Sequence, residues 1–157
     1  MAELAMNIYR KRLAAGENAF STSSTYLLIL VSTQWLDQSD LEDLDVIGVA
    51  GDSTTLPFNY ELPTTSGYAR QTLGSTWAVT EDDAGNRADV DNADVTFSAV
   101  SSGAGIIGAA ILVLERTAND SSGRELVASF DTGFPVTPNG GDVTVQWSTG
   151  GLVQLTT

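Results

Sequence analysis

The sequence predicts a mainly β fold, either a single antiparallel sandwich or a distorted barrel, with a short N-terminal α-helix. Segments of strand length recur along the chain, and they are either alternately apolar and polar or continuously apolar. Stretches rich in Gly, Asn, Asp and Pro separate these segments, and such residues favour turns. Apolar side chains at helical spacing are found in the first residues of the chain. This pattern is typical of one β-rich domain.

Residues 2–15 form the predicted helix. Apolar side chains recur there at helical spacing, and Gly16 provides a C-terminal stop. Arg10, Lys11 and Arg12 fall in its last turns, where positive charge complements the helix dipole. The dipole alone accounts for this placement. The same three cations are also candidates for an arm that docks on an acidic partner.

The predicted strands occupy most of the remaining chain. They span residues 26–33, 68–73, 75–80, 94–100, 106–115, 125–130, 143–147 and 152–155. The continuously apolar strand at 106–115 is expected to be covered on both faces. A turn containing Gly123 separates it from the next strand and indicates an antiparallel hairpin. We therefore expect one β-rich domain over residues 17–157, with residues 1–16 packed on it or extending from it.

The charge of the chain limits its partners. It carries 20 Asp and Glu against 7 Lys and Arg, a net charge of −13. Binding to DNA or RNA depends on cations that displace counterions from phosphates, so we expect no nucleic-acid partner. The acidity favours solubility, or else a cationic partner or ion. Only 17% of the residues are charged, below the roughly 25% typical of soluble domains, which suits a protein packed against neighbours.

The residue types limit the chemistry. The chain has no Cys and no His, which excludes zinc sites built on them and nucleophiles activated by an imidazole. Lys11 is the only lysine, so a phosphate-binding or Schiff-base lysine is not expected. The glycines at 103, 105 and 108 precede a strand, whereas a nucleotide-binding loop precedes a helix. The apolar run at 105–114 is too short to span a membrane. We predict no catalytic residue, metal or cofactor, and therefore no enzyme.

Two acidic segments require separate interpretation. Residues 37–45 and 81–94 contain oxygen ligands suited to calcium, but neither has the ligand spacing of an EF-hand. In the first, Ser39 and Glu42 have capping-box spacing and predict a short helix. The second, around Gly85, is better explained as a solvated hairpin turn.

A few large side chains are candidates for partner contact. Trp35 and Trp77 could lie at a subunit interface, stack on sugars, or belong to the core. Arg70 lies on the polar side of the strand at 68–73, and we expect it to pair with an acid across the sheet or a subunit boundary. With Arg10, Lys11 and Arg12 these form the predicted partner-contact set. Carboxylate pairs of a glycoside hydrolase remain an alternative that no spacing supports.

The order of several short motifs resembles that of a group of small virion proteins of tailed bacteriophages, known as head decoration or tail-fibre proteins. The motifs are Ser66-Gly67-Tyr68-Ala69-Arg70-Gln71-Thr72-Leu73, Trp77, Asp94-Val95-Thr96-Phe97, the Gly-rich apolar strand, and Gly123-Arg124-Glu125-Leu126. The resemblance covers nearly the whole chain. Where family members usually carry a Trp-Gly pair, this chain has Gly103-Ala104-Gly105.

The resemblance implies a structural role without catalytic residues. It implies a decoration, or cement, protein that binds the major capsid protein and stabilises the head. Such a protein is assembled in the bacterial cytoplasm, resides in the virion, and is expected to be a homo-oligomer, most commonly a trimer. The alternative is a tail-fibre or baseplate module that contacts a host receptor or glycan.

Overall fold

The structure is a computed structural model, and it describes residues 3–5, 15, 24–34, 60–85, 87–115, 125–147 and 151–156. These residues form antiparallel strands and two short 3-10 helices, so the fold is mainly β as predicted. The strands are β1 (Glu3–Ala5), β2 (Thr25–Ser32), β3 (Gln71–Thr72), β4 (Ala78–Asp82), β5 (Arg87–Asp91), β6 (Val95–Phe97), β7 (Ile107–Glu115), β8 (Glu125–Phe130), β9 (Val143–Val145) and β10 (Val153–Thr156). The 3-10 helices are η4 (Thr64–Ser66) and η5 (Ser102–Ala104).

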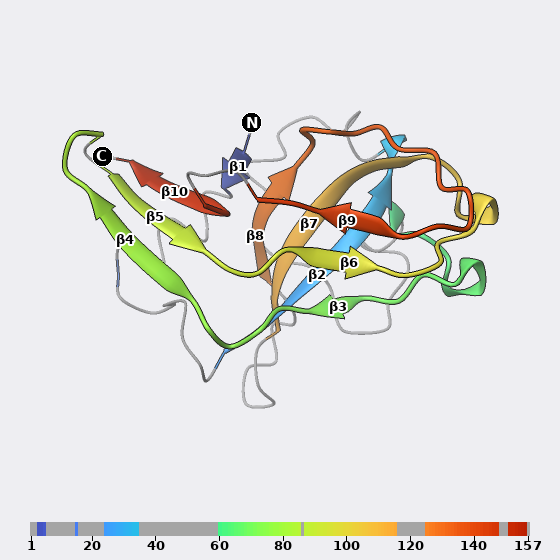
Figure 1. Ribbon diagram of the computed structural model, residues 1–157, viewed down its shortest axis with the longest axis horizontal. Coiled ribbons are helices and arrows are strands. Elements are labelled where there is room, and N and C mark those ends of the chain that lie inside the picture. Colours follow the sequence, from blue (N-terminus) through green and yellow to red (C-terminus); the bar gives the residue numbers. More distant parts are fainter. Residues whose placement is uncertain are drawn as a thin grey trace.

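The largest sheet has the strand order β1-β8-β7-β2-β3, with every neighbouring pair antiparallel. Strands β2, β7 and β8 form its centre (Figure 1). The hairpin predicted between the strands at 106–115 and 125–130 is confirmed. Within the described part of the chain, the outer strands β1 and β3 pair on one side only. The sheet is therefore open, and the predicted alternative of a barrel is wrong.

Strands β2 and β7 are apolar along nearly their whole length because both of their faces are covered. Leu28 and Leu30 point to one face of the sheet and Ile29 and Val31 to the other, since successive side chains of a strand alternate. All four side chains are fully buried. Each such burial stabilises the fold by about 1.5–3 kcal/mol. The two-sided cover expected for residues 106–115 is confirmed by the burial of β7.

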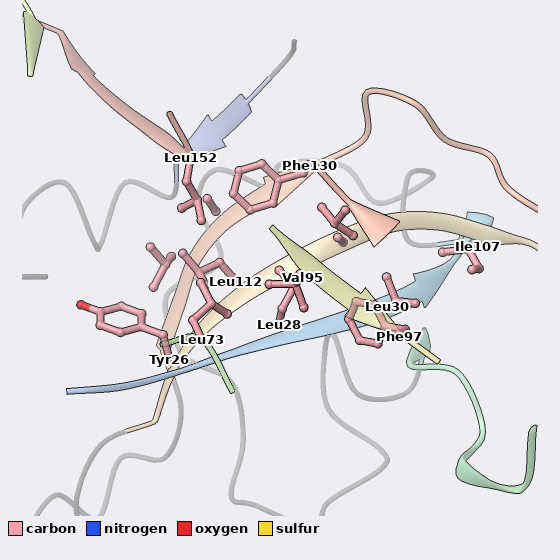
Figure 2. Packing of buried hydrophobic residues seen from close by; sticks show 14 of the residues in the cluster. Tyr26, Leu28, Leu30, Leu73, Val95, Phe97, Ile107, Leu112, Phe130 and Leu152 are labelled. Atoms are coloured by element: carbon pink, nitrogen blue, oxygen red, sulfur yellow. The ribbon is translucent and has the colours of Figure 1, made fainter. Parts of the chain in front are cut away.

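The main hydrophobic core lies on one face of this sheet, beneath the β6–β9 pair. Val95 and Phe97 of β6 belong to the same buried cluster as Leu28 and Leu30 of β2 (Figure 2). The ring of Tyr68 stacks on Phe97 with the centroids 5.8 Å apart. The inward side chains of β6 therefore cover one face of the central strands and join the β6–β9 pair to them.

The helix predicted over residues 2–15 is wrong at its beginning. Residues Glu3–Ala5 form β1 instead, which pairs antiparallel with β8, Glu3 opposite Phe130. Helix propensities differ between ordinary residues by only tenths of a kcal/mol. Pairing of residues 3–5 with β8 provides hydrogen-bond partners for N–H and C=O groups along the outer side of β8. This pairing outweighs the local helix preference, so residues 3–5 form a strand. Residues 6–14 lie outside the described residues.

The acidic stretch predicted as a turn over residues 82–94 is also partly wrong. It contains β5, which pairs with β4 on one side and β10 on the other. Val90 lies between Asp89 and Asp91 and is buried in the core, while the two aspartates are only partly covered. This alternation is that of a strand with one apolar face, and two neighbours offset the low strand propensity of Asp.

The three-stranded sheet with order β10-β5-β4 stands at one end of the molecule (Figure 1). Strand β5 lies in the middle, and β4 and β10 form the two outer edges of this sheet. The two 3-10 helices and the loops around them lie at the opposite end (Figure 1). The two ends differ in charge, since the β4–β5 hairpin is acidic and the residues of η4 and η5 are uncharged.

Candidate functional site

Two of the predicted partner-contact residues, Arg70 and Trp77, are described by the structure. The other four, Arg10, Lys11, Arg12 and Trp35, lie outside the described residues, as does the acidic segment at 37–45. Arg70 and Trp77 are not brought to one site. The groups they contact lie near Leu30 and at Tyr26 of β2, positions roughly 13 Å apart along a strand.

Arg70 forms a two-bond ion pair with Glu61 of the same chain. Its Nε donates to Glu61 Oε1 at 2.7 Å, and its Nη2 donates to Oε2 at 2.6 Å. The side chain of Glu61 is 10% exposed and that of Arg70 is 31% exposed. Parallel bonds between guanidinium and carboxylate are both stronger and more directional than a single contact. The expected pairing of Arg70 with an acid is therefore present, and it is intramolecular.

Tyr68 joins this pair to the central sheet. Its buried hydroxyl donates to Glu61 Oε1 at 2.8 Å and accepts a hydrogen bond from the backbone N–H of Leu30 at 3.2 Å. The N–H of Leu62 donates to the carbonyl of Leu30 at 3.0 Å. Because β3 pairs only with Leu27 and Leu28, Tyr68 and Leu62 satisfy the backbone of β2 where β3 has ended.

Gly67 positions Tyr68 for this contact. Its φ is +80°, a conformation that glycine adopts without steric cost. A Cβ on Gly67 would also lie 2.8 Å from the carbonyl oxygen of Ala99. Residues Gly67 to Arg70 thus help to build a structural clamp, made of Glu61, Tyr68 and Arg70.

The electrostatics of the clamp favour its present protonation. Burial, followed by the charge and the hydrogen bond of Glu61, raises the pKa of Tyr68 well above its ordinary value of 10.0. The hydrogen bond to Glu61 likewise raises the pKa of Arg70. Tyr68 therefore remains a neutral hydrogen-bond donor and Arg70 remains a cation.

We expect the clamp to make stability fall at high pH. Between the ordinary pKa of 10.0 and the raised pKa of Tyr68, the folded state holds a proton that the unfolded state has lost. The contribution of this proton to the free energy of unfolding is complete below pH 10.0. It is lost as the pH rises above 10.0, by up to about 1.4 kcal/mol per pH unit. Urea unfolding at several pH values should show this slope in the wild type and a smaller slope in Tyr68→Phe. Equal slopes would contradict the prediction.

Trp77 packs inside the protein. Its ring meets that of Tyr26 edge to face, with the centroids 4.9 Å apart. It is partly buried and packs against the hydrophobic core. An aromatic pair of this geometry stabilises by about 0.5–1.5 kcal/mol beyond burial. The core interpretation of Trp77 therefore accounts for its position.

Trp147 is held in a similar way. Its ring lies 5.1 Å from that of Phe130, and its Nε1 donates to the carbonyl of Ala93 at 2.9 Å. Its backbone N–H donates to Asp94 Oδ1 at 3.1 Å. Both described tryptophans thus serve the core, and neither forms an open aromatic platform.

The acidic segment at 81–94 contains the turn of the β4–β5 hairpin, so the hairpin turn expected there is confirmed. Asp82 Oδ1 accepts from the N–H of Gly85 at 3.0 Å and shapes the turn. Arg87 pairs with Asp82 and with Asp89, at 2.9 Å in each case. Among the described residues, no group of three or more carboxylates is placed to hold a metal ion.

The opposite end of the molecule, here named the loop end, is made of residues 63–67, 98–106 and 133–141, none of which is charged, and the exposed Asp142 borders it. Backbone hydrogen bonds join these loops. The N–H of Ser101 donates to the carbonyl oxygen of Ser66 at 2.9 Å, and the N–H of Gly140 donates to the carbonyl oxygen of Val100 at 2.9 Å. Ile107 and Val136 exchange two backbone bonds of 2.9 and 3.0 Å. The loop end is therefore preorganised, although it is built from turns.

The loop end also exposes apolar surface and holds a strained residue. Ile106 is 48% exposed, beside Gly105. Ala99 has a φ of +53°, which costs roughly 1–2 kcal/mol for a residue with a Cβ. Its N–H donates to Asp142 Oδ1 at 3.0 Å, which helps to hold this conformation. Strained backbone of this kind is concentrated at functional sites.

No family model matches the chain, and no curated protein or solved structure is significantly similar to it. Within the described residues, no helix is long and apolar enough to span a membrane. The case for a function therefore depends on the surfaces described above and on the motif resemblance.

Proposed function

We propose that this protein is a structural virion protein of a tailed bacteriophage, a decoration or cement subunit that binds the major capsid protein and stabilises the head. The observation that carries the proposal is the loop end. None of residues 63–67, 98–106 and 133–141 is charged, with Asp142 at the border, Ile106 is exposed, and hydrogen bonds join the loops to one another.

These properties suit a permanent protein contact. The centres of protein interfaces are depleted in charge, because each buried charge must be desolvated. Loops that are ordered before binding lose little conformational entropy on association, which leaves more of the contact energy as affinity. On a symmetric shell, many modest contacts add to a large avidity. Binding energy that exists only in the assembled head stabilises the head.

The oligomer that we propose follows from the same role. Cement proteins act at symmetry positions of a shell, so a cyclic homo-oligomer, with a trimer favoured, would match its sites to the lattice. The tail-fibre or baseplate alternative would gain from exposed aromatic platforms for glycans. Trp77 and Trp147 are both packed against the core, so these two residues do not favour it.

The proposal predicts where the protein lies and which variant displaces it. Gold-labelled antibody on intact particles should mark heads evenly, and Ile106→Glu should reduce the copies per head at least about tenfold, because an unpaired charge would enter the contact. Thr96→Glu places the same charge on the exposed face of β6 and is the matched control, with wild-type occupancy expected. Label confined to the tail tip, or no label on particles, would refute the proposal.

A further inference from the structure

Strand β4 has an open outer side. It pairs with β5 on its inner side, and no strand of the described chain pairs with it on the other. Residues 78–81 are exposed, and Val79, at 60%, is one of two exposed large hydrophobic side chains in the described residues. The outer edge of a strand presents N–H and C=O groups with which another chain can pair.

The only protection that β4 carries against such pairing is the negative charge of Glu81 and Asp82, which does not oppose a cationic segment. Proteins commonly protect an outer strand with proline, lysine, a bulge or a very short length. Strand β4 contains neither proline nor lysine, and its register with β5 is unbroken from Ala78 opposite Asp91 to Asp82 opposite Arg87. It is five residues long, whereas the outer strands of the main sheet, β1 and β3, have three and two.

The side chains of β4 specify what an added strand should carry. Val79 pairs directly with Val90, which is buried, so Val79 continues an apolar row up to the open edge. Glu81 is two residues away and therefore lies on the same face. An added strand would place one residue opposite Val79 and a second, two positions along, opposite Glu81. Apolar and opposite-charge partners are the favoured cross-strand neighbours for these two.

The surroundings of the edge are strongly acidic. The β4–β5 hairpin carries five carboxylates and one guanidinium, a net charge of −4: Glu81, Asp82, Asp83, Asp89 and Asp91 against Arg87. Arg87 is engaged by Asp82 and Asp89. A cationic segment would therefore be attracted to the edge, and an acidic one repelled.

We propose that β4 binds an extended cationic segment of a partner protein by strand addition, with an aliphatic residue opposite Val79 and a lysine or arginine opposite Glu81. The identity of the partner as a virion protein rests on the proposed function. The preference of β4 for a cationic segment is independent of it. Main-chain hydrogen bonds supply affinity in this mode, and alternate side chains supply specificity.

A second copy of β4 fits the edge poorly. Antiparallel pairing centred on Thr80 would place Val79 of one copy against Glu81 of the other, and pairing centred on Glu81 would place two like charges together. Like charges directly opposite each other destabilise a strand pair. The register centred on Val79 avoids these contacts, but it still brings two hairpins of net charge −4 together, so charge favours a cationic segment over self-association.

The test uses the intact protein and a fluorescent peptide of sequence Thr-Lys-Thr-Val-Thr-Lys-Thr, which presents lysine on either side of valine in both directions. Fluorescence anisotropy should show saturable binding. Glu81→Lys should weaken it at least about tenfold, whereas Asp131→Lys, with the same change of net charge away from β4, should change it less than about threefold. Methylating alternate backbone nitrogens of the peptide should abolish binding in one of the two possible phases.

Three results would overturn the inference. They are an absence of binding, binding that survives both methylation phases, and equal loss in the two lysine variants, because the last two indicate attraction by charge alone. The outcome is separate from that of the proposed function. If the protein binds the peptide but is absent from particles, the proposed function is refuted and the strand-addition inference is supported. If the protein labels heads but does not bind the peptide, only the strand-addition inference is refuted.

Discussion

Replacing Gly108 with alanine is expected to lower the free energy of unfolding by about 3 kcal/mol or more, at the upper end of overpacking effects. A Cβ on Gly108 would lie 2.5 Å from Thr33 Cα and 2.8 Å from the carbonyl oxygen of Ser32. These are backbone atoms of the neighbouring strand segment, so they cannot move aside as a flexible side chain does. The pairing of β2 with β7 shifts register at this point, after Val31.

The expected loss of stability in Gly108→Ala is opposite in sign to the usual effect of replacing glycine with alanine. In an ordinary strand, alanine is preferred to glycine by roughly 0.5–1 kcal/mol. Gly103→Ala is the matched control, since its Cβ would meet only Ser101 Oγ at 3.5 Å. Urea unfolding of both variants measures the difference. Equal stability of the two variants would show that β2 and β7 can separate locally at low cost.

Disrupting the clamp is expected to have the second largest effect. Glu61→Ala should cost about 2–3 kcal/mol, because it removes the acceptor of both Arg70 and Tyr68 in a largely buried position. Arg70→Ala should cost less, about 1–2 kcal/mol, since its side chain is 31% exposed and the charge is partly screened. Both exceed the cost expected for an exposed ion pair.

A double-mutant cycle separates the pair from its surroundings. The coupling of Glu61 with Arg70 should exceed about 1 kcal/mol, the ceiling for exposed pairs. Arg87 with Asp82 is a control within the same chain, because both of its side chains are 32% exposed. Its coupling should stay below about 1 kcal/mol. Equal couplings would mean that Glu61 is as well solvated as Asp82 and that the clamp adds little.

The candidate contact residues could be predicted only in part. The pairing of Arg70 with an acid follows from strand alternation, but its partner Glu61 does not, since the two residues lie nine positions apart in the sequence and no spacing rule links them. The exposed position of Val79 was also missed. Its alternation with Glu81 resembles that of any half-buried strand, and only the order β10-β5-β4 leaves it at an open edge. The Gly-rich stretch that begins at Gly103 is expected to precede a strand, and in the structure it leads from η5 of the loop end into β7.

Local sequence patterns are sufficient to predict the mainly β class, the central strands β2, β7 and β8, and the β7–β8 hairpin. Continuous apolar runs of strand length, bounded by turn residues, are local features with few alternative structures. Tertiary structure alone decided that Glu3–Ala5 is a strand, that Arg87–Asp91 is a strand within an acidic stretch, and that Tyr68 satisfies Leu30. In each case the local preference is worth less than the hydrogen bonds and burial supplied by segments distant in sequence.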